Sequence, residues 1–144
     1  MKKLSSAKIL YVEDGIFASK VGQAVLRKIS DNVYPVFSGF EALKLFHQIR
    51  PDIVITDMDM PGMSGSELVS RIRLIDKTTP IIIVSAMDGI TELPLNAVPK
   101  PITVDNIKPL MAELIYGRNQ ADLETEKKLY QLSRNRLRYP PQVS

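Results

Sequence analysis

The stretch IVITDMDMPGMSG, residues 53–65, carries most of what decides the fold of this chain. It opens with β-branched apolar residues, the composition of a strand buried on both faces of a parallel sheet. Asp57 follows this run directly, and Ser64 and Glu67 then have the spacing of a capping box, which marks the start of a helix. The residues that this helix is expected to turn inward are Leu68, Ile72 and Ile75. The stretch therefore predicts a buried strand, a loop that starts with a carboxylate, and a helix.

The same strand and helix pattern recurs on both sides of this stretch. Apolar runs predict strands at residues 9–12, 33–37, 53–56, 81–84 and, more weakly, 95–98. Helical patterns fill most of the gaps between them. Alternation of this kind favours an α/β doubly wound domain with a parallel sheet, and we expect that domain to occupy residues 1–116.

The predicted helices have recognisable starts and apolar faces. The second helix begins with a capping box at Ser38 and Glu41, and the last is expected to begin near Asp105 with Pro109 in its first turn. The residues expected to face inward are Ala18, Val21, Val25 and Ile29 in the first helix, Ala42, Leu45, Phe46 and Ile49 in the second, and Leu110, Leu114 and Ile115 in the last.

Composition narrows the class of protein. The chain has 144 residues, of which 44% are hydrophobic, and no cysteine, so a disulfide framework and a thiolate metal site are both excluded. No apolar run approaches the roughly 20 residues needed to span a bilayer, and we expect a soluble, cytoplasmic protein. The net charge of +3 arises in residues 117–144, which hold 6 of the 19 basic and 3 of the 16 acidic side chains. Nucleic-acid binding is therefore not expected, since the body of the chain is neutral.

Residues 117–144 form a charged, helix-favouring tail. Leu123, Tyr130 and Leu137 recur at seven-residue intervals, and Pro140 and Pro141 end the pattern. We interpret the tail as a partly flexible extension of the last helix or as a linker, with homodimerisation through this helix as a further possibility. It is too short to form a core of its own. Whether the chain is complete or a piece of a longer protein stays open.

Polar side chains follow four of the five predicted strands. Glu13 and Asp14 follow the first strand, Asp57 the third, Ser85 the fourth and Lys100 the fifth. The carboxyl ends of parallel strands share one edge of the sheet, so these groups are expected to meet there. Oxygen ligands without His or Cys suit Mg²⁺, and a lysine with a hydroxyl suits a phosphoryl group. A carboxylate beside both can act as a nucleophile toward phosphorus.

These residues resemble the receiver domain of two-component response regulators. The resemblance covers about residues 6–116 and rests on ILYVED at 9–14, PDIVITDMDMPGMSG at 51–65, PIIIVSA at 80–86 and PKP at 99–101. It implies a flavodoxin-like (βα)5 fold with strand order 2-1-3-4-5. It also implies a phosphoacceptor that works with a histidine kinase or phosphotransfer protein and catalyses only its own phosphorylation and dephosphorylation.

The resemblance assigns a role to each matching residue. Asp57 would accept the phosphoryl group, Lys100 would pair with it, and Ser85 would turn its hydroxyl toward it on activation. The residues implied to hold Mg²⁺ are Asp14, Asp57, Asp59 through its backbone carbonyl, and Glu13 through water. Asp59 and Met87 occupy positions that tune dephosphorylation, and the bond between Lys100 and Pro101 would be cis.

The chain departs from the family between Ser85 and Lys100. The advance is fifteen residues, about seven residues or two helical turns shorter than usual. We therefore expect the fourth helix to be shortened or missing, with at most one irregular turn before Pro94. Ala97 stands where the family has an aromatic switch residue, so coupling of phosphorylation to output by the usual route is in doubt.

Two other classes of function remain as alternatives. A phosphorylation-independent interaction module could retain the same fold and the same side chains. Asp57 and Asp59 also match the start of haloacid-dehalogenase-type phosphatases, but no late acidic pair follows. His47, with no second histidine in the chain, is interpreted as a surface residue.

Overall fold

The computed structural model describes residues 3–86, 96–117, 128 and 131–132 and contains a five-stranded parallel sheet in the order β2-β1-β3-β4-β5. This order confirms the predicted flavodoxin-like topology. The strands are β1 (Lys8–Val12), β2 (Asn32–Val36), β3 (Ile53–Asp57), β4 (Ile81–Ser85) and β5 (Ala97–Pro99). The helices are η1 (Leu4–Ser6), α1 (Ile16–Leu26), α2 (Gly39–Ile49), α3 (Gly65–Ile75) and α4 (Val104–Tyr116).

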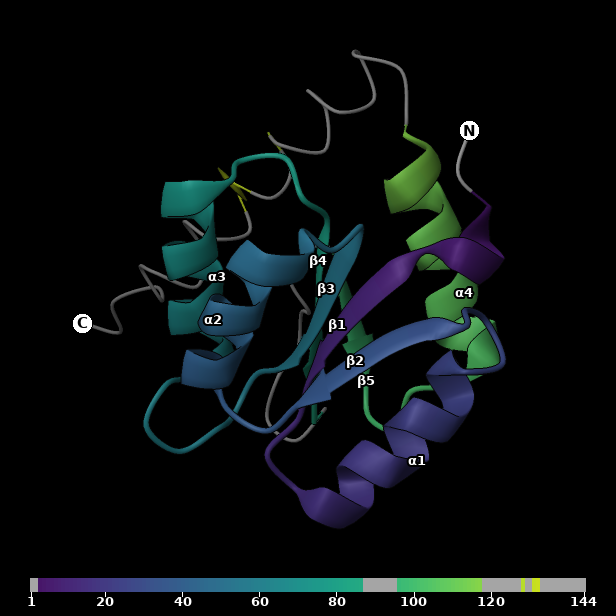
Figure 1. The fold of residues 1–144 in the computed structure, drawn as a ribbon, viewed down its shortest axis with the longest axis horizontal. Helices are drawn as coiled ribbons and strands as arrows, with labels where there is room; N and C mark the ends of the chain where they lie inside the picture. The colour runs from purple at the N-terminus through teal and green to yellow at the C-terminus, as the bar shows by residue number, and fades with distance from the viewer. Residues whose placement is uncertain (1–2, 87–95, 118–127, 129–130, 133–144) are drawn as a thin grey trace, which may run out of the picture.

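The helices cover the sheet as two layers, with α2 and α3 on one face and α1 and α4 on the other (Figure 1). Each face has its own apolar cluster. The cluster under α2 and α3 contains Leu10, Val54, Phe46, Leu68 and Ile72, among others. The cluster under α1 and α4 contains Tyr11, Ile55, Leu26, Ile107 and Met111, among others. Strand β3 is buried along its whole length, as its composition predicts.

Capping explains where three helices begin. The hydroxyls of Ser38 and Ser64 accept hydrogen bonds from the backbone N–H groups of Glu41 at 3.2 Å and Glu67 at 3.1 Å, as the capping boxes predict. Helix α4 begins at Val104 because Thr103 and Asn106 form a further capping box. Pro109 therefore lies in the second turn of α4, and its expected placement in the first turn was wrong.

As predicted, Val25 packs against the apolar cluster and Ile29, just past the helix end, is buried, but helix α1 also turns inward residues that were not predicted. Its buried residues are Ser19, Gly22 and Leu26, whereas Ala18 is exposed and Val21 is 43% exposed. A Cβ atom on Gly22 would lie 2.0 Å from the hydroxyl oxygen of Tyr11, so only glycine lets the helix approach this ring. The fit between Gly22 and Tyr11 fixes the rotation of α1 and leaves part of its apolar face exposed to solvent.

The segment leading into β5 differs in its boundaries from the prediction. The strand has three residues, Ala97–Pro99, instead of 95–98. Asn96, with a φ of 67°, turns the chain just before it. The bond between Lys100 and Pro101 is cis, as the resemblance implies. Residues 87–95, where the shortened fourth helix was expected, lie outside the described residues.

Helix α4 ends at Tyr116, because Gly117 has φ 78° and ψ 152°, outside the helical region. The extension that the sequence suggested therefore does not continue directly from α4. Lys128, Gln131 and Leu132 are helical, and most of the tail lies outside the described residues. No helix in the described ranges is long and apolar enough to cross a membrane.

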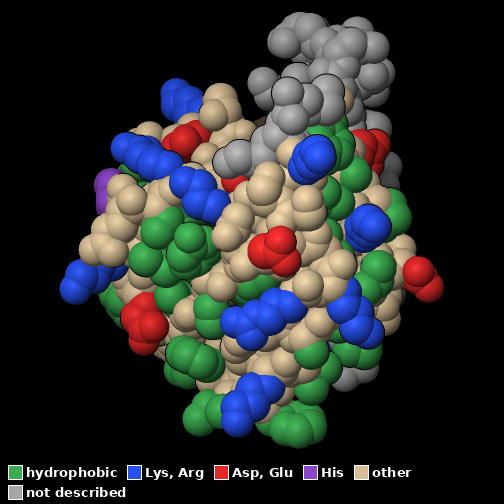
Figure 2. All heavy atoms as spheres, turned by 45° about the vertical axis from the view of Figure 1, so that its right-hand side comes forward, with side chains coloured by type: hydrophobic (Ala, Val, Ile, Leu, Met, Phe, Trp, Pro, Cys, Tyr) green, Lys and Arg blue, Asp and Glu red, His purple; other side chains and the backbone are tan. Residues whose placement is uncertain are grey.

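Charged side chains are dispersed over the surface that Figure 2 shows. Lys and Arg side chains are interspersed there with acidic and apolar ones and form no continuous basic patch. This face of the described chain therefore lacks the concentrated positive charge that a nucleic-acid backbone attracts.

Candidate functional site

Backbone hydrogen bonds fix the chain just beyond the strand ends. The N–H of Glu13 donates to Val36 at 3.1 Å, that of Met58 to Val84 at 3.0 Å, and that of Lys100 to Ser85 at 2.9 Å. These bonds continue the parallel pairing past β1, β3 and β5, so the side chains at this edge project from a rigid frame.

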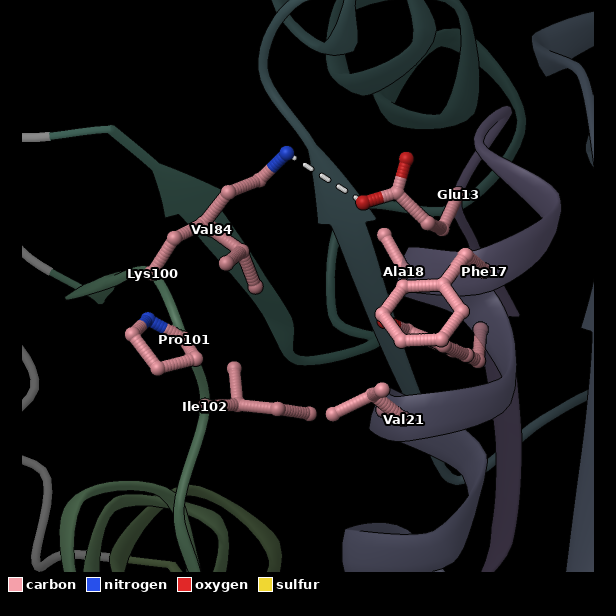
Figure 3. Close-up of a pocket in the computed structure, with 10 residues that line it drawn as sticks. Glu13, Phe17, Ala18, Val21, Val84, Lys100, Pro101 and Ile102 are labelled. Carbon is pink, nitrogen blue, oxygen red and sulfur yellow. Dashed lines mark hydrogen bonds and ion pairs between the residues drawn. The ribbon is translucent and has the colours of Figure 1, made fainter.

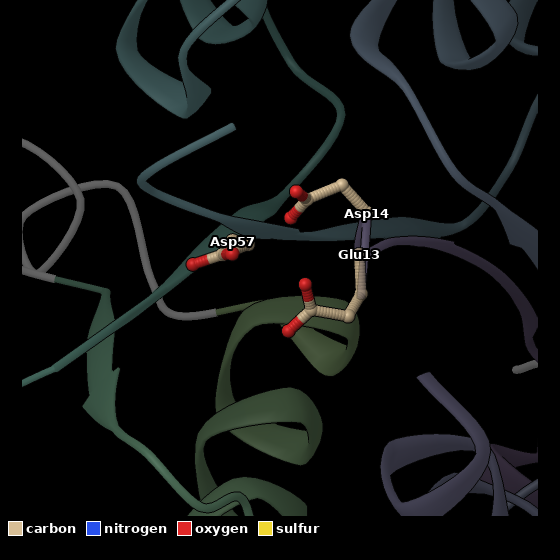
Figure 4. Close-up of side chains that lie close together, drawn as sticks. All are labelled: Glu13, Asp14 and Asp57. Atoms are coloured by element: carbon tan, nitrogen blue, oxygen red, sulfur yellow. The ribbon is translucent and has the colours of Figure 1, made fainter. Parts of the chain in front are cut away.

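Three carboxylates converge at this edge (Figure 4). One oxygen from each of Glu13, Asp14 and Asp57 lies within 4.8 Å of the others. Glu13 and Asp57 are each only 4% exposed, and Asp14 is half-buried. Carboxylates held this close repel one another unless a positive charge lies between them. The donor set is all oxygen, which suits a hard divalent cation, so the predicted metal residues fit such an ion.

Lys100 brings an ammonium group to the same cluster. Its Nζ lies 3.0 Å from Oδ1 of Asp57 and 3.2 Å from Oε1 of Glu13. The two acids come from β3 and the end of β1, and Lys100 follows β5, so one side chain ties three strands together. Sequence reasoning expected Lys100 near Asp57, but not its pairing with Glu13.

The pKa shifts at this edge follow from burial and from these pairs. Burial raises the pKa of Glu13, the N–H of Gly15 opposes this, and the nearby charge of Asp57 raises it further. Lys100 lowers the pKa of Glu13, but the net shift remains upward. For Lys100, burial alone would lower the pKa, but its hydrogen bonds and charge interactions with Asp57 and Glu13 outweigh burial and raise it.

Ser85 reaches the same edge, where its hydroxyl donates to a backbone carbonyl. The side chain is 2% exposed, and Oγ donates to the carbonyl oxygen of Ala86 at 3.1 Å. Its own carbonyl accepts the N–H of Lys100. In this structure the carbonyl of Ser85 positions the backbone of Lys100, and its hydroxyl is hydrogen-bonded to Ala86.

The other residues singled out by sequence have less direct contact with the cluster. The N–H of Asp59 donates to Oδ1 of Asp57 at 3.4 Å, while its side chain is exposed. Ala97 is half-buried in β5 and pairs with Ile83 of β4. His47 is exposed on α2, as expected. Met87 lies outside the described residues.

Sequence reasoning missed two residues that shape this edge. A Cβ on Gly65 would lie 2.3 Å from the carbonyl oxygen of Asp57, and the N–H of Gly65 donates to Met58 at 2.7 Å. Gly65 thus lets α3 start directly against the acceptor loop. The buried hydroxyl of Thr56 donates to the carbonyl oxygen of Asp57 at 3.0 Å. The glycine within a capping box was a usable signal for Gly65, but nothing in the sequence distinguished Thr56.

Comparisons with known proteins agree with this geometry. The response regulator receiver domain family matches residues 9–107. The probable transcriptional regulator ycf27 of Guillardia theta is 35% identical over 121 residues, which cover 79% of this chain and 47% of that protein. Sporulation initiation phosphotransferase F of Bacillus subtilis is 31% identical over 112 residues, covering 73% of this chain and 90% of that protein. The chain thus spans about half the length of the transcriptional regulator.

Solved structures show the same fold. A response regulator receiver domain protein from Clostridium thermocellum has a TM-score of 0.66 at 26% identity, covering 76% of this chain and 94% of that one. The chemotaxis response regulator CheY4 of Vibrio cholerae has a TM-score of 0.64 at 25% identity, covering 76% of this chain and 98% of that one. With its acidic edge, its strand order and these matches, the chain belongs to the response regulator receiver domain family of two-component systems.

Proposed function

We propose that Asp57 is the phosphoacceptor of this receiver domain and takes its phosphoryl group from the phosphohistidine of a histidine kinase or phosphotransfer protein. The observation that carries this proposal is the surroundings of Asp57. Its carboxylate is 4% exposed, lies 3.0 Å from the ammonium of Lys100, and shares a 4.8 Å cluster with Glu13 and Asp14. A carboxylate in such a site is positioned for phosphoryl transfer.

The transfer exchanges one bond for another. A carboxylate oxygen of Asp57 attacks phosphorus, and a P–O bond forms as the P–N bond to the donor imidazole breaks. The electron pair of that bond leaves with the imidazole, which takes up a proton. The product is an acyl phosphate on Asp57, and water later cleaves it to phosphate and the free carboxylate.

Receiver domains generally bind Mg²⁺ at an acidic pocket, and the cluster here supports the same ion. Glu13, Asp14 and Asp57 are the side chains that would hold it, with Glu13 acting through water and Asp59 contributing its backbone carbonyl. When bound, Mg²⁺ would neutralise negative charge on the phosphoryl oxygens. The three carboxylates and one ammonium sum to a formal charge of −2, which a divalent ion balances.

Lys100 and Ser85 contribute groups to the phosphorylated state. Lys100 already contacts Asp57 and Glu13, so a phosphoryl group on Asp57 would meet its ammonium without a large movement. Ser85 would have to exchange its hydrogen bond to Ala86 for one to the phosphoryl group. The exposed side chain of Asp59 and, by family position, Met87 would tune access of hydrolytic water.

The protein donor would dock on the exposed apolar side chains of α1. Ile16 is 69% exposed and Phe17 is 81% exposed, an unusual exposure for side chains of this size. Both lie in the first turn of α1, two to four residues past Glu13 and Asp14 along the chain. A helical donor seated there would bring its histidine next to the acidic edge.

The signal would leave by a route that does not use the family's aromatic switch. Ala97 has no ring to reorient, so a change at Asp57 would pass through the backbone of Ser85 and Lys100, which are hydrogen-bonded.

Residues 1–116 would form the receiver domain, and residues 117–144 would form a tail able to pair with a second copy of the chain. Light-scattering mass with and without residues 118–144 tests the dimer, and a monomer in both cases rules it out.

Intact mass spectrometry after treatment with acetyl phosphate and Mg²⁺ tests the phosphoacceptor. We expect one added phosphoryl group in the wild type, none in Asp57→Asn, and an unchanged adduct in Asp31→Asn. Asp31 is an exposed acid that precedes β2, at the opposite edge of the sheet. An adduct that survives Asp57→Asn would assign the phosphoryl group to another residue and overturn the proposal. No adduct in the wild type would favour a phosphorylation-independent interaction module.

A further inference from the structure

A cavity of about 240 Å³ lies between α1 and the segment that follows β5 (Figure 3). Its apolar wall is formed by Phe17, Ala18 and Val21 from α1 and by Pro101 and Ile102 from the other side. Val21 and Ile102 point toward each other across it. The cavity reaches Glu13 and Lys100, so it borders the acidic edge without including Asp57.

Tyr11 gives this cavity a buried polar group. The side chain is 5% exposed and lines the cavity, with its hydroxyl facing Gly22 of α1. Among the described residues it has no hydrogen-bond partner, although buried tyrosine hydroxyls are normally paired. Burial, followed by the charges of Glu13 and Asp57, raises the pKa of Tyr11. The hydroxyl lies against Gly22 at the α1 side of the cavity, where it donates to none of the described residues.

Charge and size define what could occupy the cavity. The carboxylate of Glu13 disfavours an anion, and the ammonium of Lys100 is already paired with two carboxylates. A neutral molecule is thus favoured over a charged one. An apolar cavity of roughly 150 Å³ accommodates benzene, so this larger one accommodates an aromatic ring with a small substituent. Because the hydroxyl of Tyr11 can donate a hydrogen bond, a ligand with a hydrogen-bond acceptor on that substituent would be favoured.

We propose that this cavity is a binding site for a small neutral aromatic molecule that carries one carbonyl acceptor, bound between α1 and Ile102 with its carbonyl on the hydroxyl of Tyr11. The ligand would contact Glu13 and Lys100 and so connect a small molecule to the phosphoacceptor edge. Binding itself is independent of the proposed function; only an effect of the ligand on phosphorylation rests on it.

Acetophenone, ethylbenzene and benzoate form a matched set of probes, with a carbonyl, no acceptor and a charge, respectively. Amide chemical shifts of the full-length, unphosphorylated chain are followed by NMR during titration. We expect acetophenone to shift Val21, Val84 and Ile102 saturably, with a Kd on the order of 1 mM for its nine heavy atoms. Ethylbenzene should bind more weakly, and benzoate should give no saturable shift.

Two variants separate the hydroxyl from the cavity. Tyr11→Phe keeps the ring and should weaken acetophenone about fivefold, the value of one hydrogen bond, while leaving ethylbenzene unchanged. Ala18→Phe fills the cavity from an exposed position on α1 and should abolish binding of both probes. For the wild type, the proposal is overturned if acetophenone produces no saturable shift at these amides or if benzoate binds equally well. For the variants, it is overturned if Ala18→Phe still binds acetophenone or if Tyr11→Phe binds it as tightly as the wild type does.

The effect on phosphorylation is a separate measurement. The rate of phosphorylation by acetyl phosphate and Mg²⁺ is compared with and without saturating acetophenone, in the wild type and in Ala18→Phe. We expect the probe to change the rate in the wild type alone. NMR binding with an unchanged rate retains the site but overturns its connection to the acidic edge. NMR binding to a chain that takes no phosphoryl group at all overturns the proposed function and leaves the site intact.

Discussion

The two faces of the sheet use their apolar helix residues differently. Under α2 and α3, the residues predicted to face inward include Ala42, Phe46, Leu68 and Ile72, and each of these is 0% exposed. On α1, Val21 was predicted to be buried by the same reasoning, yet it is 43% exposed. The same prediction was wrong for Ile75, the last residue of α3, which is 40% exposed. Similar periodicity thus buries the apolar residues in the middle of α2 and α3, whereas on α1 an apolar residue in the middle of the helix stays exposed.

The difference arises from how each helix is held. Helices α2 and α3 are held by large side chains in the apolar cluster beneath them. Helix α1 contacts the core through Leu26 and through the small residues Ser19 and Gly22, and Gly22 makes room for the ring of Tyr11. Small residues at the contact turn the larger apolar ones outward, beside Glu13 and Lys100. An apolar stripe on a helix can therefore serve binding as well as the core.

The largest expected effect comes from truncating a core residue on the α3 face. Leu68→Ala should lower the free energy of unfolding by about 2–5 kcal/mol, because it leaves a cavity in a fully buried cluster. Val21→Ala on α1, its matched control, should lower it by less than about 1 kcal/mol, since Val21 is already partly solvated. Urea unfolding followed by circular dichroism measures both. Equal losses would mean that α1 packs as the sequence predicted.

A smaller loss is expected when a methyl group is added beneath α1. Gly22→Ala should cost about 1–3 kcal/mol, because the new Cβ overlaps the ring and hydroxyl of Tyr11. Gly15→Ala is the control, since the Cβ there would make only an ordinary contact with Ala18 at 3.5 Å. Adding Tyr11→Val to Gly22→Ala should reduce the cost of the alanine. If the costs of the two changes simply add, the fit does not hold α1 in place.

Most of the fold could be predicted because its signals are local. Buried β-branched runs and the capping boxes at Ser38 and Ser64 each report on their own segment, and the strand order followed from the family resemblance. The rotation of α1 could not be predicted, since it depends on Tyr11 meeting Gly22 across the domain. The pairing of Lys100 with Glu13 spans 87 residues and likewise could not be predicted from local sequence patterns. Helix α4 begins at Val104, next to the predicted Asp105, but its capping box was missed because asparagine replaces the usual acid.

A still smaller effect should appear in the pH dependence of stability. Burial raises the pKa of Glu13, so the folded chain holds a proton at pH values where an unfolded glutamate has lost it. Without Mg²⁺, stability should therefore fall as pH rises from the ordinary glutamate range through the raised pKa. Glu13→Gln should remove this decline.

Glu67→Gln is the matched control for Glu13, because Glu67 is an exposed glutamate on α3 that pairs with Arg71. It should keep the decline of the wild type. Thermal unfolding at a series of pH values measures all three chains. If the decline in stability persists in Glu13→Gln, another titrating group causes it.

The smallest change in stability is expected at exposed apolar residues, where the two faces should differ in function instead. Phe17 on α1 is 81% exposed and Leu74 on α3 is 87% exposed, so Phe17→Ala and Leu74→Ala should each alter the free energy of unfolding by less than about 0.5 kcal/mol. Phe17→Ala should nevertheless slow transfer from any histidine kinase that phosphorylates the wild type by roughly tenfold, because it removes an aromatic anchor from the proposed docking surface. Leu74→Ala should leave that transfer unchanged.

Acetyl phosphate needs no docking surface, so the rate at which it phosphorylates Phe17→Ala separates lost docking from a damaged acidic edge. If both variants slow the kinase equally, the apolar surface of α1 has no special role, and the contrast between the two faces is one of packing alone.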